Sequence, residues 1–136
     1  MSDTALYSLS NAQTIRESKG RSIVSFPDTY CVIDTETTGR SPQWDHIIEV
    51  AAVKISDGRE TGRFSSLIQP PSMPGGTYVD EFIAALTGIT DEMLAGAPFA
   101  PDVLGEFATF VGDAPVVGHY VSFDINFLYD SFDRYL

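Results

Sequence analysis

Short apolar runs separated by turn signals dominate the chain between residues 28 and 70. Residues 30–33 are Tyr, Cys, Val and Ile, a continuous run that predicts a strand buried on both faces. A nearly unbroken apolar run at 46–54 is separated from a third run at 61–69 by an Asp-Gly turn, and two prolines follow. Three successive strands with hairpin connections predict an antiparallel start to a sheet.

From residue 77 onward the apolar positions recur with helical spacing. Thr77 is the predicted N-cap of a helix that ends at Gly88, with Asp80 three residues later as its capping-box partner. The expected buried face of this helix consists of Val79, Phe82, Ile83 and Leu86. Thr90 then caps a short second helix at 91–95.

The last third of the sequence predicts a helix at 101–111, a short buried strand at 114–118 and a final helix from 122 to 136. The helical stripes are Val103, Phe107, Phe110 and Val111 in the first, and Ile125, Leu128, Phe132 and Tyr135 in the second. A glycine inside a helix costs about 1 kcal/mol relative to alanine. We therefore expect a close packing contact at Gly105.

The composition is that of one folded domain of 136 residues, with 43% hydrophobic residues and a net charge of −11. A single cysteine excludes an intrachain disulfide, and no apolar run approaches the roughly 18 residues that span a membrane. Without a secretory pattern, a cytoplasmic protein is expected. Residues 1–27 are polar and comparatively basic, which predicts a flexible extension before a domain at 28–136. The net charge opposes nonspecific binding to nucleic acid, which relies on lysine and arginine.

Two carboxylates, Asp34 and Glu36, follow the first strand. Residues two apart in a strand lie on the same face, so the strand places two negative charges side by side. Such a pair is costly beside an apolar core unless a cation offsets it, and hard oxygen donors suit Mg²⁺ or Mn²⁺. The alternative is that both are solvated residues where a strand meets a loop.

A polar loop at 40–45 carries the single tryptophan, Trp44. An exposed tryptophan near a metal site can stack on a nucleobase. A tryptophan can instead anchor its own loop against the core, and the sequence leaves both interpretations open.

Three segments together resemble a known family. The hexapeptide at 34–39, Asp-Thr-Glu-Thr-Thr-Gly, is similar to the first motif of the DEDD (DnaQ-like) superfamily of 3′–5′ exonucleases, which includes the proofreading epsilon subunit of bacterial DNA polymerase III. Residues 117–128, with Phe-Asp before a Phe-Leu pair, resemble the second motif, although Tyr120 stands where the family usually has asparagine. Residues 86–90 resemble the segment that lies against the terminal nucleotide. The likeness covers residues 28–136.

This resemblance implies an α/β fold of the ribonuclease H-like kind, a mixed sheet with helices on both faces. It implies two Mg²⁺ or Mn²⁺ ions held by Asp34, Glu36 and Asp124, which are also the catalytic residues. The implied substrate-binding residues are Thr37, Thr38, Thr87, Gly88, Ile89 and Phe123. The implied substrate is the 3′ end of single-stranded DNA, with RNA as the alternative, and a DNA polymerase is an implied partner.

The family's third motif, a histidine five residues before a fourth carboxylate, is not found in these 136 residues. His119 and Asp124 have that spacing, but using Asp124 there would leave the second motif empty. His46, at the entrance of the second strand, is a candidate substitute base.

We therefore expect the chain to lack the family's final strand and helix and to be weak or inactive as an enzyme. The strand at 114–118 would then be an exposed sheet edge that allows self-association. The alternative function is a non-catalytic nucleic-acid-binding or interaction module on the same fold.

Overall fold

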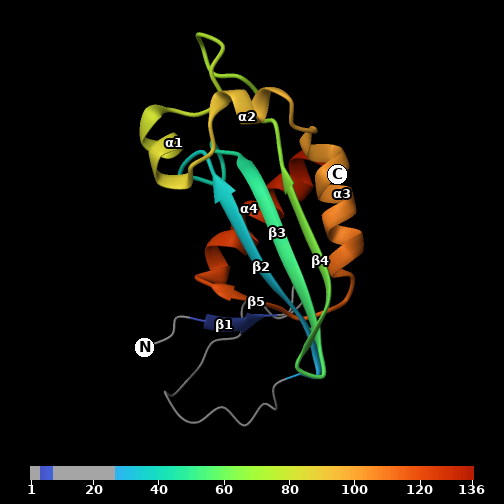
Figure 1. Cartoon of the computed structure of the whole chain (residues 1–136). Coiled ribbons are helices and arrows are strands. Elements are labelled where there is room, and N and C mark those ends of the chain that lie inside the picture. Colours follow the sequence, from blue (N-terminus) through green and yellow to red (C-terminus); the bar gives the residue numbers. More distant parts are fainter. Residues whose placement is uncertain (1–3, 8–26) are drawn as a thin grey trace.

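Five strands form one mixed sheet in the order β1-β5-β2-β3-β4 (Figure 1). This computed structural model describes residues 4–7 and 27–136. The strands are β1 (Thr4–Tyr7), β2 (Thr29–Thr37), β3 (Ile47–Ser56), β4 (Arg59–Leu67) and β5 (Val116–His119), and the helices are α1 (Glu81–Thr87), α2 (Asp91–Ala95), α3 (Ala100–Val111) and α4 (Val121–Tyr135). β2, β3 and β4 are antiparallel, whereas β5 runs parallel to β2. The predicted mixed sheet with packed helices is confirmed.

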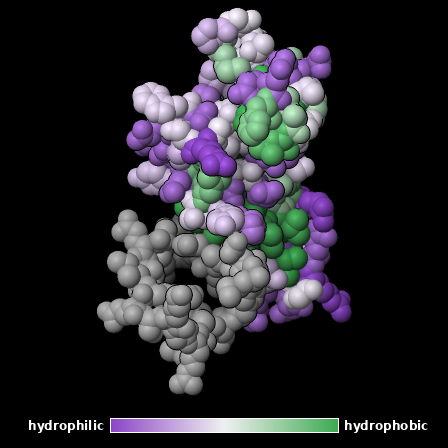
Figure 2. Space-filling model, turned by 90° about the vertical axis from the view of Figure 1, so that its left-hand side faces the viewer, coloured by the Kyte–Doolittle hydropathy of each residue, from purple (hydrophilic) through white to green (hydrophobic). Residues whose placement is uncertain are grey.

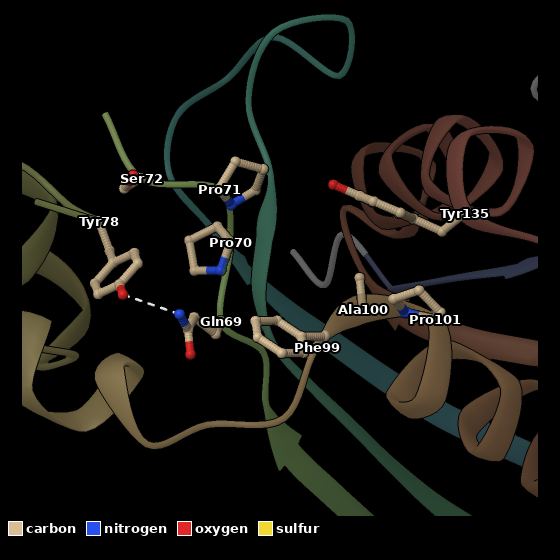
Figure 3. A pocket seen from close by; sticks show the side chains of 9 residues that line it. All are labelled: Gln69, Pro70, Pro71, Ser72, Tyr78, Phe99, Ala100, Pro101 and Tyr135. Carbon is tan, nitrogen blue, oxygen red and sulfur yellow. Dashed lines mark hydrogen bonds between the residues drawn. The ribbon is translucent and has the colours of Figure 1, made fainter. Parts of the chain in front are cut away.

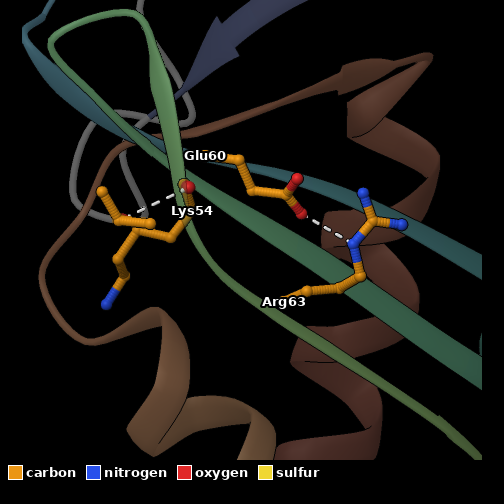
Figure 4. Close-up of polar contacts among 4 residues, drawn as sticks. Lys54, Glu60 and Arg63 are labelled. Atoms are coloured by element: carbon orange, nitrogen blue, oxygen red, sulfur yellow. Dashed lines mark hydrogen bonds and ion pairs between the residues drawn. The ribbon is translucent and has the colours of Figure 1, made fainter.

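The hairpin between β3 and β4 turns at Asp57 and Gly58, whose φ angles are 52° and 77°. Positive φ at both central residues matches the right-handed twist of the strands, which is why Asp-Gly favours this turn. On β4, Glu60 and Arg63 form an ion pair of 2.7 Å (Figure 4). Because both side chains are exposed, this pair contributes little to stability.

The two faces of β2 have different surroundings. Cys31 and Ile33 are buried at 0% and 3% exposure and belong to the main core, whereas Val32 is 39% exposed and Asp34 is exposed. The prediction of a strand buried on both faces is therefore wrong. Its core face packs with α3 and α4, and the opposite face carries the first carboxylates.

The main core lies between the sheet and the last two long helices. Its buried members are Cys31, Ile33, Ile47, Val50, Ala52, Ile68, Val103, Leu104, Phe107, Val111, Val116, Val121, Ile125, Phe127 and Leu128. Phe110, Phe132 and Tyr135 pack against it while partly buried, so both predicted helical stripes face the core.

The backbones of β5 and β2 approach closely. A Cβ added at Gly118 would lie 2.9 Å from the carbonyl oxygen of Ile33, so only glycine fits between the two strands without a shift. In this parallel pairing Cys31 is opposite Val116. The chain leaves β5 directly into α4, which brings the first turn of that helix to the end of β2.

Helix α1 begins later than the sequence predicts. Its N-cap is Asp80, whose carboxylate accepts a hydrogen bond from the Ile83 amide, and not Thr77. The amides of Tyr78 and Val79 instead donate to the carboxylate of Asp91 in the first turn of α2, which takes them out of any helix.

The predicted buried face of α1 is correct for half of its members. Val79 and Ile83 are buried with Ile48 in a second small core cluster, but Phe82 and Leu86 are 72% and 69% exposed. Figure 2 views the side of the molecule on which α1 lies, and a green hydrophobic patch stands there among purple residues. The late helix start explains this result, because only one side of a two-turn helix can meet the sheet.

The strand β5 is not the edge of the sheet. Thr4–Tyr7 form β1 and pair with it antiparallel, with Leu6 opposite Val117. The expectation of an exposed edge at 114–118 is therefore corrected, and β1 is the outermost strand on that side. These four residues fall within the predicted extension at 1–27, of which residues 1–3 and 8–26 lie outside the described residues.

The expected packing contact at Gly105 is absent, because an added Cβ would meet nothing within 4 Å. Replacing Gly105 with alanine should therefore raise the free energy of unfolding by about 0.5–1 kcal/mol, through helix propensity and a less flexible unfolded chain. Urea unfolding measures this change. The matched control is Gly112→Ala, which should destabilise because φ at Gly112 is 58°. A loss of stability in Gly105→Ala would contradict the expectation.

Candidate active site

Three acidic residues lie around the carboxyl end of β2, close enough for the charge of Asp34 to raise the pKa of the other two. Asp34 is exposed and Glu36 is partly buried on the same face of the strand. Asp124 lies in the first turn of α4, where its side chain is 3% exposed and accepts a hydrogen bond from the hydroxyl of Thr35. Thr35 belongs to the strand segment between the other two carboxylates, so it joins α4 to the site.

The local charge balance is strongly negative. Burial raises the pKa of Glu36, and the charges of Asp34, Glu49 and Asp124 raise it further. Glu49 faces Glu36 directly across the β2–β3 pairing. Repulsion of this kind favours the binding of a cation.

The pKa of Asp124 rises to about 6. Burial is the main cause and the charge of Asp34 adds to it, while hydrogen bonds from the hydroxyl and backbone of Thr35 oppose the rise. The carboxylate is therefore held in a protein environment that stabilises its protonated form when no cation is near.

The donors suit a hard divalent cation, because carboxylate oxygens are the ligands that Mg²⁺ and Mn²⁺ prefer. Within the described residues, however, no three His, Cys, Asp or Glu side chains come close enough together to hold a metal ion. Joint binding by Asp34, Glu36 and Asp124 therefore requires the side chains to move toward the ion.

The family model for exonucleases, RNase_T, matches residues 31–136. The chain belongs to this exonuclease family. A PolC-type DNA polymerase III from Oceanobacillus iheyensis is 45% identical over 109 residues, which are 80% of this chain and 7% of that protein. The epsilon subunit of DNA polymerase III from Aquifex aeolicus is 45% identical over 100 residues, which are 74% of this chain and 47% of that protein.

Solved structures agree on the fold. The zinc-bound form of an E. coli ExoI–ssDNA complex superposes with a TM-score of 0.67 at 20% identity, covering 79% of this chain and 24% of that one. The exonuclease domain described here thus spans less than half of the length of each of these proteins. The predicted resemblance to epsilon-type exonucleases is confirmed.

The loop after the first motif of the exonuclease domain is closed by polar contacts. Asp45 accepts hydrogen bonds from the Thr38 hydroxyl at 3.1 Å and from the Ser41 amide at 3.0 Å. A Cβ at Gly39 would lie 2.4 Å from the carboxylate of Asp45, so this glycine makes room for that contact. The Thr38 amide also donates to the carbonyl of His46 at 2.9 Å.

Arg134, near the end of α4, clamps the same loop. Its guanidinium donates to the carbonyls of Pro42 and Gln43 at 3.3 and 3.1 Å and lies 2.9 Å from Nδ1 of His46. Burial lowers the pKa of His46, and the charge of Arg134 lowers it further against a smaller opposing effect of Asp45. A neutral His46 accepts a hydrogen bond from the guanidinium of Arg134 at Nδ1, and this contact connects α4 to the loop.

The predicted substrate residues have mainly internal contacts. Thr37 is 8% exposed and donates to the carbonyl of Gly39 at 2.6 Å. The hydroxyl of Thr38 donates to the carboxylate of Asp45 and accepts a hydrogen bond from the amide of His46. With these side chains engaged, it is the backbone at the end of β2 that lies beside the carboxylates.

The segment after α1 closes that helix. Thr87 donates to the carbonyl of Ile83 at 2.8 Å, and Gly88 is the C-cap with φ of 76°. Ile89 is 3% exposed and packs in the small core cluster. Phe123 is 36% exposed, and its ring centroid lies 4.8 Å from that of Phe127, which places a partly open aromatic next to Asp124.

Three residues that position the site, Thr35, Asp45 and Arg134, are not predicted from the sequence. Thr35 lies between the two recognised carboxylates but on the other face of the strand, and alternation along β2 could have singled it out. Asp45 follows the polar loop without any motif of its own. Arg134 offers no local signal, since it lies 88 positions from its partner His46.

An open pocket of about 320 Å³ lies beyond the end of β4 and is lined by prolines and aromatic rings (Figure 3). Its lining residues are Gln69, Pro70, Pro71, Ser72, Tyr78, Phe99, Ala100, Pro101 and Tyr135. The amide of Gln69 donates to the Tyr78 hydroxyl at 2.9 Å within it. None of the three carboxylates lines this pocket, so it is distinct from the acidic site.

No helix among the described residues is both long and apolar enough to cross a bilayer.

The raised pKa of Asp124 gives stability a defined pH dependence in the absence of metal. Its folded pKa of about 6 lies above the ordinary 3.8, so the folded state binds the proton more tightly. The contribution is fully present below about pH 4 and is lost as pH rises through about 6. At about 1.4 kcal/mol per pKa unit the loss is at most about 3 kcal/mol, and solvent screening reduces it to about 1–2 kcal/mol.

Urea unfolding with EDTA at pH 4.5 and pH 7 measures this loss. The Asp124→Asn variant removes the titrating group, so its stability should change less between the two pH values. An identical pH dependence in the variant and the parent would contradict the assignment.

Proposed function

We propose that this chain is a metal-dependent 3′–5′ exonuclease domain that removes nucleotides from the 3′ end of single-stranded DNA, as in proofreading or trimming. The observation that carries the proposal is the placement of Asp34, Glu36 and Asp124 around the carboxyl end of β2, where the charge of Asp34 raises the pKa of both other carboxyl groups. Membership of the exonuclease family supports the same conclusion.

In this proposal Asp34 and Glu36 hold two Mg²⁺ or Mn²⁺ ions, and Asp124 completes the coordination of one. When bound, such ions act as Lewis acids that stabilise the charge developing on the phosphate oxygens. Thr35 orients Asp124 through its hydroxyl, and the partly exposed Phe123 lies against the terminal nucleotide. Backbone at Thr37 and at the turn around Gly88 completes the nucleotide site.

The choice of DNA rests on the relatives, and the choice of the 3′ end rests on the resemblance of residues 34–39 and 117–128 to the motifs of 3′–5′ exonucleases. Both curated relatives are DNA polymerase III proteins, and the structural neighbour holds single-stranded DNA and zinc. Because the chain spans less than half of each, we propose the substrate, the direction and a DNA polymerase partner for this domain by analogy.

The general base is the missing part of the mechanism. His46 is an unsuitable base, because the guanidinium of Arg134 already donates a hydrogen bond to its Nδ1. A general base contributes about 10²–10⁴-fold to rate. We therefore propose that these 136 residues alone hydrolyse DNA slowly, and that adding a strand and helix with a His-x4-Asp motif restores activity.

A single-turnover assay on 5′-labelled single-stranded DNA with Mn²⁺ tests the function. We expect a ladder of products shortened one nucleotide at a time from the 3′ end, faster for the extended chain. A 3′-phosphorothioate oligonucleotide is the control for direction. Products shortened from the labelled end, or activity that survives EDTA, would contradict the proposal.

The second candidate is a non-catalytic nucleic-acid-binding or interaction module. It is favoured by one observation: the three carboxylates do not form a ready metal-binding group within the described residues. This candidate predicts DNA binding without hydrolysis in both chain lengths, even at high Mn²⁺.

A further inference from the structure

We propose that Trp44 is a stacking platform for a nucleobase of the bound single strand, and that Asp45 and Arg134 are the positioning residues that hold it. The inference rests on the proposed function, because it names a contact to the strand whose 3′ end reaches the carboxylates. The indole is 78% exposed, more than any other large hydrophobic side chain in the described residues.

The indole is not what holds its loop in place. The backbone amide of Trp44 donates to the Ser41 carbonyl at 3.0 Å, and Asp45 supplies the side-chain contacts of the loop. Arg134 binds the two carbonyls that precede Trp44 in the chain. Polar groups therefore anchor the loop, and the alternative that the indole anchors it against the core is wrong, because the side chain is exposed.

An exposed aromatic side chain binds a ligand more effectively when the loop that carries it is rigid. The loop is fixed at its base by the Thr38–His46 backbone bond and at its tip by Arg134. Little conformational entropy is therefore left to lose when a base stacks on the indole. Tryptophan is usually largely buried, so exposure on a fixed loop is informative.

The position of the loop favours nucleic acid over another ligand. It joins β2 to β3 directly after the strand that carries Asp34 and Glu36. Stacking acts on the π-face of a base and needs no positive surface, which suits a chain with a net charge of −11.

One cation accompanies the indole. Arg40, in the same loop, is exposed and forms no ion pair within the described residues. Lys54 lies over the Phe110 ring, Arg63 pairs with Glu60, and Arg134 is occupied by the clamp. The remaining cation of the described residues, Arg59, begins β4 and does not belong to this loop. Arg40 is thus available for the phosphate next to the stacked base.

Because Trp44 is the single tryptophan of the chain, its fluorescence reports on this site alone. We would titrate the full chain with a dT oligonucleotide in Ca²⁺ and with an abasic oligonucleotide of equal length. The dT strand should quench the indole and the abasic strand should not. Trp44→Ala should weaken binding of dT, measured by anisotropy, by about 5- to 150-fold, which is the 1–3 kcal/mol of one stacked base at 1.4 kcal/mol per tenfold change.

Two further variants separate stacking from a structural role. Trp44→Phe keeps an aromatic face and should retain affinity within about threefold, and the melting temperatures of both Trp44 variants should equal that of the parent because the side chain is exposed. Arg134→Lys should also weaken binding, but in the Trp44→Ala background it should add no further loss.

The outcomes distinguish this proposal from the proposed function. One outcome is quenching of the parent by dT and weaker binding of dT in Trp44→Ala, without hydrolysis by any chain length. That result would support the stacking site and contradict the exonuclease. Hydrolysis with unchanged affinity in Trp44→Ala, or equal quenching by the abasic strand, would overturn the stacking site alone; the indole would then serve a protein contact. No binding of dT by the parent would overturn both.

Discussion

Replacing Asp34 with Asn or Glu36 with Gln is expected to lower the rate of 3′-end hydrolysis by about 10³-fold or more in the extended, active chain. A bound ion contributes several kcal/mol of charge stabilisation, and each 1.4 kcal/mol is a factor of ten in rate. The same variants should lose the rise in melting temperature that Mn²⁺ gives the parent, since the ion stabilises the folded state by binding to it.

Glu49→Gln is the matched control, because Glu49 faces Glu36 across the sheet but lies outside the first motif. It removes one nearby negative charge and should leave the rate within about tenfold. Equal stabilisation by Mn²⁺ in the parent and in the Asp34→Asn/Glu36→Gln double variant would refute the metal site.

Replacing Phe127 with alanine is expected to cost about 3–5 kcal/mol of stability, because its side chain is 0% exposed within the main core. The ring also supports Phe123, next to Asp124, so the loss extends to the site. Chemical unfolding measures the cost. Phe127→Leu, which keeps an apolar side chain, should cost less than half as much. A loss below about 1.5 kcal/mol in Phe127→Ala would show that the core is loosely packed there.

The sequence predicted those parts of the fold that local patterns encode. The Asp57-Gly58 hairpin and the stripe of α4 with Ile125 and Leu128 follow from turn chemistry and periodicity, and both are present. The recognised motif placed Asp34 and Glu36 at the end of β2 for the same reason, since residues two apart share a face.

The errors arose where a distant residue overrides a local preference. Thr77 has the sequence of an N-cap, but Asp91 takes the amides that would begin the helix, and so Asp80 becomes the cap. Phe82 fits the helical period, yet no element of the described chain covers it. A single-sequence pattern contains no information on either contact.

The candidate site shows the same limit. Carboxylates in a specific hexapeptide are recognisable, whereas Thr35 and Arg134 act through partners that are 89 and 88 positions away. Tyr120 is a related case: it adopts left-handed backbone with φ of 51°, a conformation that asparagine tolerates better than tyrosine and that a helical or strand pattern does not reveal.

The clamp between Arg134 and the loop at 42–46 also constrains the order of folding. The contacts that complete the site join residues 88 and 89 positions apart, so the chain must close long loops before they can form. The hairpins of β2, β3 and β4 can form first, from neighbouring residues alone. Detachment of the whole of α4 from the folded protein would release Asp124 in its first turn and, through Arg134 in its last turn, the loop of Trp44. The backbone amides of both segments should therefore exchange their hydrogens as a single cooperative unit.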